Sequence, residues 1–124
     1  MPEATLTETA VRLVFACSGA ADVGEIADRV ARLLQREGTA RMYCLGGIGG
    51  KVDDILSAAR GAERIMVIDG CPLDCAKRCL EQAGFTDLRH LRLTDHQMEK
   101  DKTPVTVRNV QLAADRAKHV LLAP

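Results

Sequence analysis

The chain has 124 residues, of which 47% are hydrophobic and only 2% aromatic, so it suits one globular domain with an aliphatic core. Its 17 basic residues balance its 17 acidic ones without a long run of either sign, which argues against a nucleic-acid or membrane-surface binder. The N-terminus lacks a basic segment and a long apolar core. We therefore expect neither a signal peptide nor a transmembrane helix, and a cytoplasmic location.

Hydrophobic periodicity predicts strands that alternate with helices. Residues 1–10 are polar and are expected to be a lead-in to one domain that spans residues 11–124. Short apolar runs predict strands at 11–16, 40–45, 64–69 and 88–93, and the run at 64–69 is rich in β-branched residues. Apolar residues at helical spacing predict helices at 22–37, at 52–60, at 72–83 and from 103 onward.

Several residues predict where these helices begin. Asp22 is expected to cap the first helix, and Pro72 to lie in the first turn of the third. Thr103 and Pro104 are expected to open the last helix, which should turn one apolar face inward. That face comprises Val107, Val110, Ala114, Ala117 and Leu121.

The alternation of strands and helices implies a parallel sheet with right-handed crossovers. About four strands with helices on both faces make a small three-layer α/β fold of the Rossmann-like or flavodoxin-like kind. We expect the strand order 2-1-3-4, with a topological switch point between the first and third strands. The strand at 88–93 is expected at an edge, because Arg89 and Arg92 interrupt its apolar pattern.

Five cysteines are many for a chain of this length. In the reducing cytosol structural disulfides are rare, and thiols are more often metal ligands, redox groups or small buried hydrophobes. Cys17, Cys44 and Cys71 stand at intervals of 27 residues, each at or just after the carboxyl end of a predicted strand. Because the carboxyl ends of parallel strands lie at the same edge of a sheet, these three thiols are expected to converge.

Cys75 follows Cys71 by four residues and can turn back toward the same edge from the first turn of the predicted helix. Four thiolates suit tetrahedral Zn(II), and iron accepts the same ligands. We therefore predict a metal site made of Cys17, Cys44, Cys71 and Cys75. Helix N-termini and the backbone N–H groups of the glycine-rich stretch 46–50 would supply the positive potential that thiolates need.

Other residues have simpler interpretations. Cys79, one helical turn further on, is expected to fill the core, with exchange against a ligand as the alternative. Asp69 is expected to accept a hydrogen bond within the Asp-Gly turn. The stretch 46–50 lacks the full phosphate-binding pattern and is expected to be a flexible turn. No histidine has a partner at ligand spacing, and we expect ordinary surface or edge positions for His90, His96 and His119, with His96 the best alternative fourth ligand.

Three motifs of the chain resemble those of the DGC-domain family. They are Asp-Gly-Cys at 69–71 with Cys75, Cys-Ser-Gly-Ala at 17–20, and Cys-Leu-Gly-Gly-Ile-Gly-Gly at 44–50. The family is named for its Asp-Gly-Cys motif and is described as having four potential zinc-chelating cysteines. The resemblance implies that these are Cys17, Cys44, Cys71 and Cys75. It implies zinc but no reaction, because the family's biochemical role is unassigned.

The leading hypothesis is therefore a cytoplasmic zinc-binding protein with a four-cysteine site at the carboxyl edge of the sheet. The first alternative is a thiol-based redox enzyme or sensor that uses Cys71, Cys75 or Cys79 without a stable metal. The second alternative is a metallochaperone. Besides the metal ion, either alternative implies a redox or metal-exchange protein partner, and the sequence does not decide whether the protein is an enzyme.

Overall fold

The computed structural model describes residues 11–124, and the lead-in predicted for residues 1–10 lies outside them. Four parallel strands form one sheet in the order β2-β1-β3-β4. Their bounds are β1 Arg12–Ala16, β2 Arg41–Met42, β3 Arg64–Asp69 and β4 Arg89–Arg92. The predicted parallel sheet and strand order are confirmed, and β4 is an edge strand as expected.

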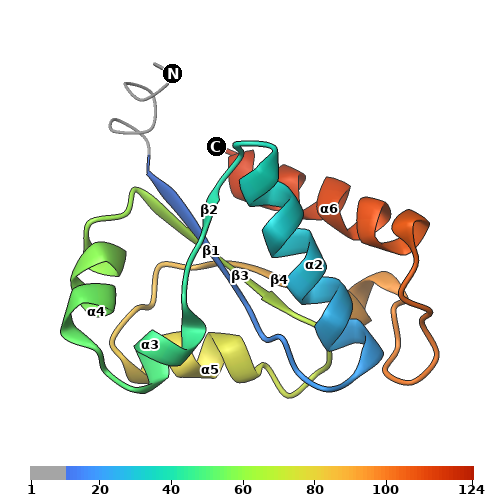
Figure 1. Cartoon of the computed structure of the whole chain (residues 1–124), viewed down its shortest axis with the longest axis horizontal. Coiled ribbons are helices and arrows are strands. Elements are labelled where there is room, and N and C mark those ends of the chain that lie inside the picture. The colour runs from blue at the N-terminus through green and yellow to red at the C-terminus, as the bar shows by residue number, and fades with distance from the viewer. Residues whose placement is uncertain (1–10) are drawn as a thin grey trace.

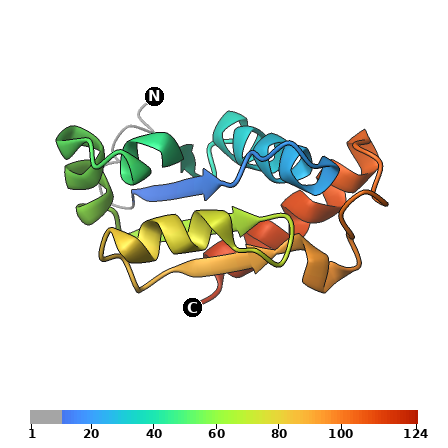
Figure 2. The same ribbon diagram turned by 90° about the horizontal axis from the view of Figure 1, so that it is seen from below.

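Helices cover both faces of this sheet. They are α2 (Asp22–Arg36), α3 (Leu45–Gly49), α4 (Asp53–Arg60), α5 (Cys75–Gln82), the short 3₁₀ helix η1 (Leu93–His96) and α6 (Val107–Leu122). Figure 1 shows α2 and α6 on one side of the sheet and α3, α4 and α5 on the other, and Figure 2 shows α5 in front of the strands. The predicted three-layer α/β fold is therefore confirmed.

Each face of the sheet has its own core, because successive strand side chains point to opposite faces. Val14 and Met66 pack against α2 and α6, whereas Phe15 and Val67 pack against the helices of the other face. Burial on both faces explains why the strands are continuous apolar runs rather than alternating ones. Within residues 11–124, no helix combines the length and apolarity needed to cross a bilayer.

The start of α2 differs from the prediction. Its N-cap is Ala21, so the expected cap at Asp22 is wrong by one residue. The Asp22 carboxylate accepts hydrogen bonds from the backbone N–H groups of Val23 (2.7 Å), Asp101 (2.9 Å) and Thr103 (3.0 Å). It therefore ties the distant loop before α6 to the start of α2, a contact that local sequence cannot predict.

The last helix also begins later than predicted. Thr106 is the N-cap of α6, and its Oγ1 accepts a hydrogen bond from the N–H of Asn109 at 3.0 Å. Thr103 is buried in the preceding loop, where its N–H is bonded to Asp22. Because α6 begins at Val107, that side chain is 87% exposed instead of facing the core. Ala114, Ala117 and Leu121 are buried as predicted.

The stretch predicted as a flexible glycine turn forms the short helix α3 instead. A Cβ on Gly47 would lie 2.6 Å from Cγ1 of Ile55 in α4, so this helix packs closely on its neighbour. Glycine is thus used here for a close helix–helix approach. The strand before it is shorter than predicted, since β2 ends at Met42.

Candidate functional site

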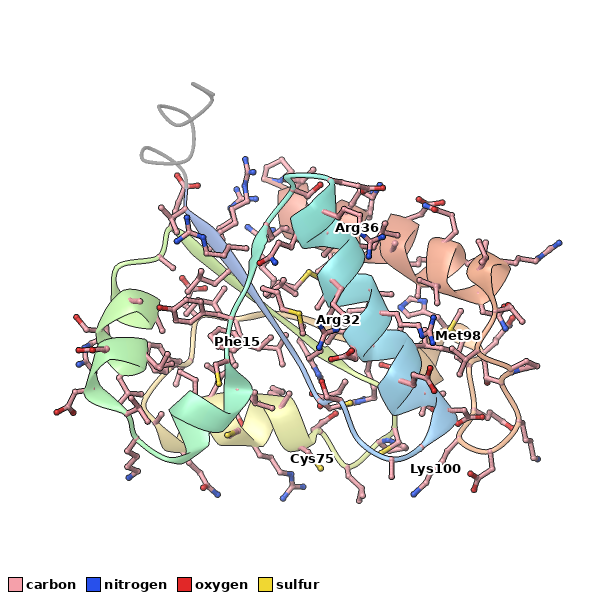
Figure 3. The ribbon with its side chains drawn as sticks, in the orientation of Figure 1. Phe15, Arg32, Arg36, Cys75, Met98 and Lys100 are labelled. Carbon is pink, nitrogen blue, oxygen red and sulfur yellow. The ribbon has the colours of Figure 1, made fainter. Side chains whose placement is uncertain are left out.

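An open cavity of about 410 Å³ lies at the carboxyl edge of the sheet. Cys17, Cys71 and Cys75, three of the four predicted ligands, line it. The segment 19–24 at the start of α2 forms another wall, and Lys100 lies on the loop after η1. Figure 3 labels Cys75 at the start of α5 and Lys100 on this loop. The cavity lies beside the ends of β1 and β3, the topological switch point where open α/β sheets bind ligands.

Cys17 follows β1 directly and is half-buried. Its Sγ accepts a hydrogen bond from the N–H of Gly70 at 3.4 Å. Burial raises the pKa of the Cys17 thiol, while the N–H groups of Gly19 and Gly70 act in the opposite direction. The backbone around this sulfur is therefore arranged to donate hydrogen bonds to it.

Asp74 directly precedes Cys75, where α5 begins, and is the last of the three residues between Cys71 and Cys75. Its backbone is left-handed, with φ 57° and ψ 42°, so the expectation that Pro72 starts the helix is wrong. The Asp74 carboxylate accepts hydrogen bonds from Arg92 of β4, at 2.8 Å from Nε and 2.6 Å from Nη2. These bonds hold the pKa of Asp74 below its usual range. Cys71 is half-buried and Cys75 is exposed.

Asp69 ends β3 and is buried, with 1% of its surface exposed. Its carboxylate accepts hydrogen bonds from the N–H groups of Ala76 at 2.8 Å and Lys77 at 3.1 Å. It therefore caps the first turn of α5, where negative charge is favoured. The expected role within the Asp-Gly turn is replaced by this longer-range one.

His90 of β4 was expected to be an ordinary edge residue, but its Nε2 lies 2.9 Å from Oδ2 of Asp69. The parallel register explains this contact, because Val67 pairs with His90 and Asp69 with Arg92. The sequence does show polar residues in this strand, with Arg89 directly before His90 and Arg92 two residues after it. This pattern does not, however, show which residue of β3 lies opposite His90.

Asp69, Asp74 and His90 form a compact group. In the described part of the chain, it is the only set of three potential metal-binding side chains whose ligand atoms all lie within 4.8 Å of one another. Its carboxylates are already bonded to backbone N–H groups and to Arg92. We therefore describe it as a hydrogen-bond network. No three cysteine sulfurs of residues 11–124 are that close together.

Cys44 and Cys79 lie outside the lining of the cavity. Cys44 is the N-cap of α3, and its exposed Sγ accepts a hydrogen bond from the N–H of Gly47 at 3.3 Å. Cys79 is half-buried against the same helix, with Sγ 3.9 Å from the carbonyl oxygen of Leu45. Burial raises the pKa of the Cys79 thiol. The inclusion of Cys44 in a metal site therefore stays a prediction.

Backbone segments approach one another closely beside the cavity. A Cβ on Gly70 would lie 2.6 Å from the carbonyl carbon and oxygen of Val23. A Cβ on Gly24 would lie 2.8 Å from the backbone nitrogen of Gly19. Glycine is required at both positions, since any side chain would push the start of α2 away from the cysteine-bearing turns.

The fold and the cavity together define a parallel α/β domain with thiols at its switch point. The family model described as the DGC domain matches residues 13–118, so the chain belongs to the DGC-domain family. It is also similar to the anaerobic and virulence modulator AnvM of Pseudomonas aeruginosa, with 40% identity over 88 residues that cover 71% of this chain and 67% of that protein. No solved structure gives a significant match.

Proposed function

We propose that this protein binds one thiophilic metal ion at the thiol-lined cavity. Zinc is the proposed ion, and iron is the alternative. The observation that carries the proposal is that Cys17, Cys71 and Cys75 line one cavity at the switch point. Three thiols, of which Cys17 already accepts a hydrogen bond from a backbone N–H, are a donor set that suits Zn(II). When bound, the ion would supply either a structural cross-link or a Lewis acid.

Cys17, Cys71 and Cys75 fit this ion because thiolates are preferred zinc ligands. To bind one ion together, their side chains have to rotate so that the sulfurs come closer to one another. Each cysteine can move its sulfur between staggered positions about χ1. Cys44 is the proposed fourth ligand, and to take part it would give up its hydrogen bond from Gly47. If Cys44 stays at the start of α3, the fourth position remains open toward the cavity, as in catalytic zinc sites.

The apo protein is expected to stay folded, because two cores of buried apolar side chains support the sheet, and the cysteines contribute only partly buried side chains to their margins. This differs from a zinc finger, which unfolds without its metal. Far-ultraviolet circular dichroism before and after treatment with a strong chelator measures the difference. Collapse of the helical signal on chelation would contradict this part of the proposal.

Metal content of protein purified under reducing conditions tests the site itself. We expect about one zinc per chain in the wild type. Serine variants of Cys17, Cys71 and Cys75 should lose it, whereas Cys79→Ser is the matched control and should retain it. Cys44→Ser separates a four-thiolate site, which loses metal, from a three-thiolate site, which keeps it. A wild type without metal, or equal loss in Cys79→Ser, would refute the proposal.

A thiol-based redox sensor is the second candidate function. It is favoured by the five free thiols, one of which, Cys75, is exposed beside two other thiols of the same cavity. A regulatory role accords with the name of AnvM as an anaerobic and virulence modulator. Both candidates suit a reducing compartment such as the cytoplasm. Absence of metal together with a reversible disulfide, found by counting free thiols after mild oxidation, would favour the sensor.

A further inference from the structure

We infer that Ser18 and Asp74 are positioning residues that hold the cavity thiols in place before a ligand binds. The inference rests on the proposed metal site and names the residues that set its geometry. Ser18 follows Cys17 directly, and Asp74 precedes Cys75 directly. The two residues therefore control the backbone next to thiols from two different strand ends.

Ser18 has a left-handed backbone, with φ 49°. This conformation is unfavourable for a serine and persists only where the surroundings enforce it. Its Oγ donates a hydrogen bond to Oδ1 of Asp28 at 2.7 Å, and Oδ2 of Asp28 accepts from Nε of Arg32 at 2.7 Å. The turn after Cys17 is thus held from the side of α2.

Asp74 repeats this arrangement directly before Cys75. Its left-handed backbone is held by the two hydrogen bonds from Arg92, and Nη1 of Arg92 also lies 3.4 Å from Asp95. Nε2 of His90 lies 3.8 Å from Oδ1 of Asp74, so two residues of β4 face this carboxylate. The turn between Cys71 and Cys75 is thus held from the edge strand.

A comparison with the other left-handed residues separates this arrangement from ordinary turn geometry. The described residues include five left-handed positions that are not glycine, at Ser18, Lys51, Asp74, Gln97 and Asp101. Within residues 11–124, only Ser18 and Asp74 among these five have side chains bonded to a charged partner. Both adjoin cavity cysteines, which is what a preorganised site requires.

Cobalt(II) titration tests the inference, because the absorption of cobalt(II) thiolates reports both affinity and coordination geometry. Arg92→Ala and Ser18→Ala should each weaken cobalt(II) binding by roughly 10- to 100-fold and alter the spectrum. Arg92→Lys should recover only part of the loss, because an ammonium group cannot reproduce the two-pronged contact. The matched control is Arg29→Ala, which breaks the exposed Arg29–Glu25 pair on the same helix as Asp28 and should bind as the wild type.

Asp74→Gly distinguishes positioning from stability. Glycine relieves the left-handed strain and removes the contact with Arg92 at once. We expect the apo protein to keep its urea midpoint while cobalt(II) affinity falls. If Arg92→Ala does not fold, Arg92→Lys and Asp74→Gly carry the test. Wild-type affinity and spectrum in the folded variants of both positions would overturn the inference while the proposed function stands. A wild type that binds no cobalt(II) would overturn both.

Discussion

Oδ2 of Asp69 lies 2.9 Å from Nε2 of His90, and this contact joins the end of β3 to the neighbouring strand β4. The same carboxylate caps that helix through the N–H groups of Ala76 and Lys77. One buried acidic group therefore connects β3, β4 and α5. The Asp-Gly-Cys motif thus begins with a structural residue, and its cysteine faces the cavity.

Replacing Asp69 by alanine should lower the free energy of unfolding by roughly 2–3 kcal/mol, because three donors lose a buried acceptor. Urea denaturation followed by circular dichroism measures the change. Asp87→Ala is the control, since Asp87 is exposed, and it should change stability by less than about 0.5 kcal/mol. Equal stability of the two variants would contradict the role assigned to Asp69.

Gly70→Ala should destabilise the protein by about 2 kcal/mol or more, because the added methyl meets the backbone of Val23 rather than a flexible side chain. Gly19→Ala offers a control in the adjoining turn, since its Cβ would have no atom within 4 Å. In thermal unfolding, the melting temperature of Gly19→Ala should be near that of the wild type, and that of Gly70→Ala should be well below it. A lower melting temperature for Gly19→Ala than for Gly70→Ala would show that the close approach of Gly70 to Val23 is not maintained in solution.

Asp22 should contribute to acid sensitivity. Desolvation raises its pKa, but the backbone N–H groups of Asp101, Thr103 and Val23 outweigh this and lower the pKa overall. A carboxylate with a lowered folded pKa stabilises the protein above the ordinary aspartate pKa of about 3.9, and this stabilisation is lost as the pH falls toward the folded value. Asp22→Asn should therefore be less stable than the wild type at neutral pH.

The stability difference between the wild type and Asp22→Asn should shrink on acidification. Urea midpoints measured from pH 7 down to about pH 3 would follow this convergence. A difference that stays constant over the whole range would mean that the Asp22 carboxylate does not stabilise the loop through its charge.

Four of the five thiols of chelator-treated protein should react with iodoacetamide in two groups. Cys44 and Cys75 are exposed and should be modified first. Cys17 and Cys79 are half-buried with raised pKa values, so less thiolate is available and modification should be at least several-fold slower. Mass spectrometry of peptides taken at intervals resolves the sites. Early modification of Cys79 would contradict its packing against α3.

Much of the cavity could be predicted from the sequence. Apolar runs and helical periodicity report which faces are buried, and their alternation implies a parallel sheet whose carboxyl ends share an edge. Cys17 and Cys71 therefore had to follow neighbouring strand ends. Cys44 departs from this logic because β2 stops two residues before it, and the cysteine caps α3 instead. The end of a two-residue strand depends on pairing with β1, which local pattern does not encode.

The sequence by itself determined the α/β class, the strand order and the edge at which Cys17 and Cys71 lie, because these follow from periodicity and the handedness of crossovers. Only the tertiary structure decided which thiols share a cavity and which residues hold them. The contacts of Asp69 with His90 and of Asp74 with Arg92 join residues 18 to 21 positions apart in the chain. They exist because of the register between β3 and β4, and register is set by packing over the whole sheet.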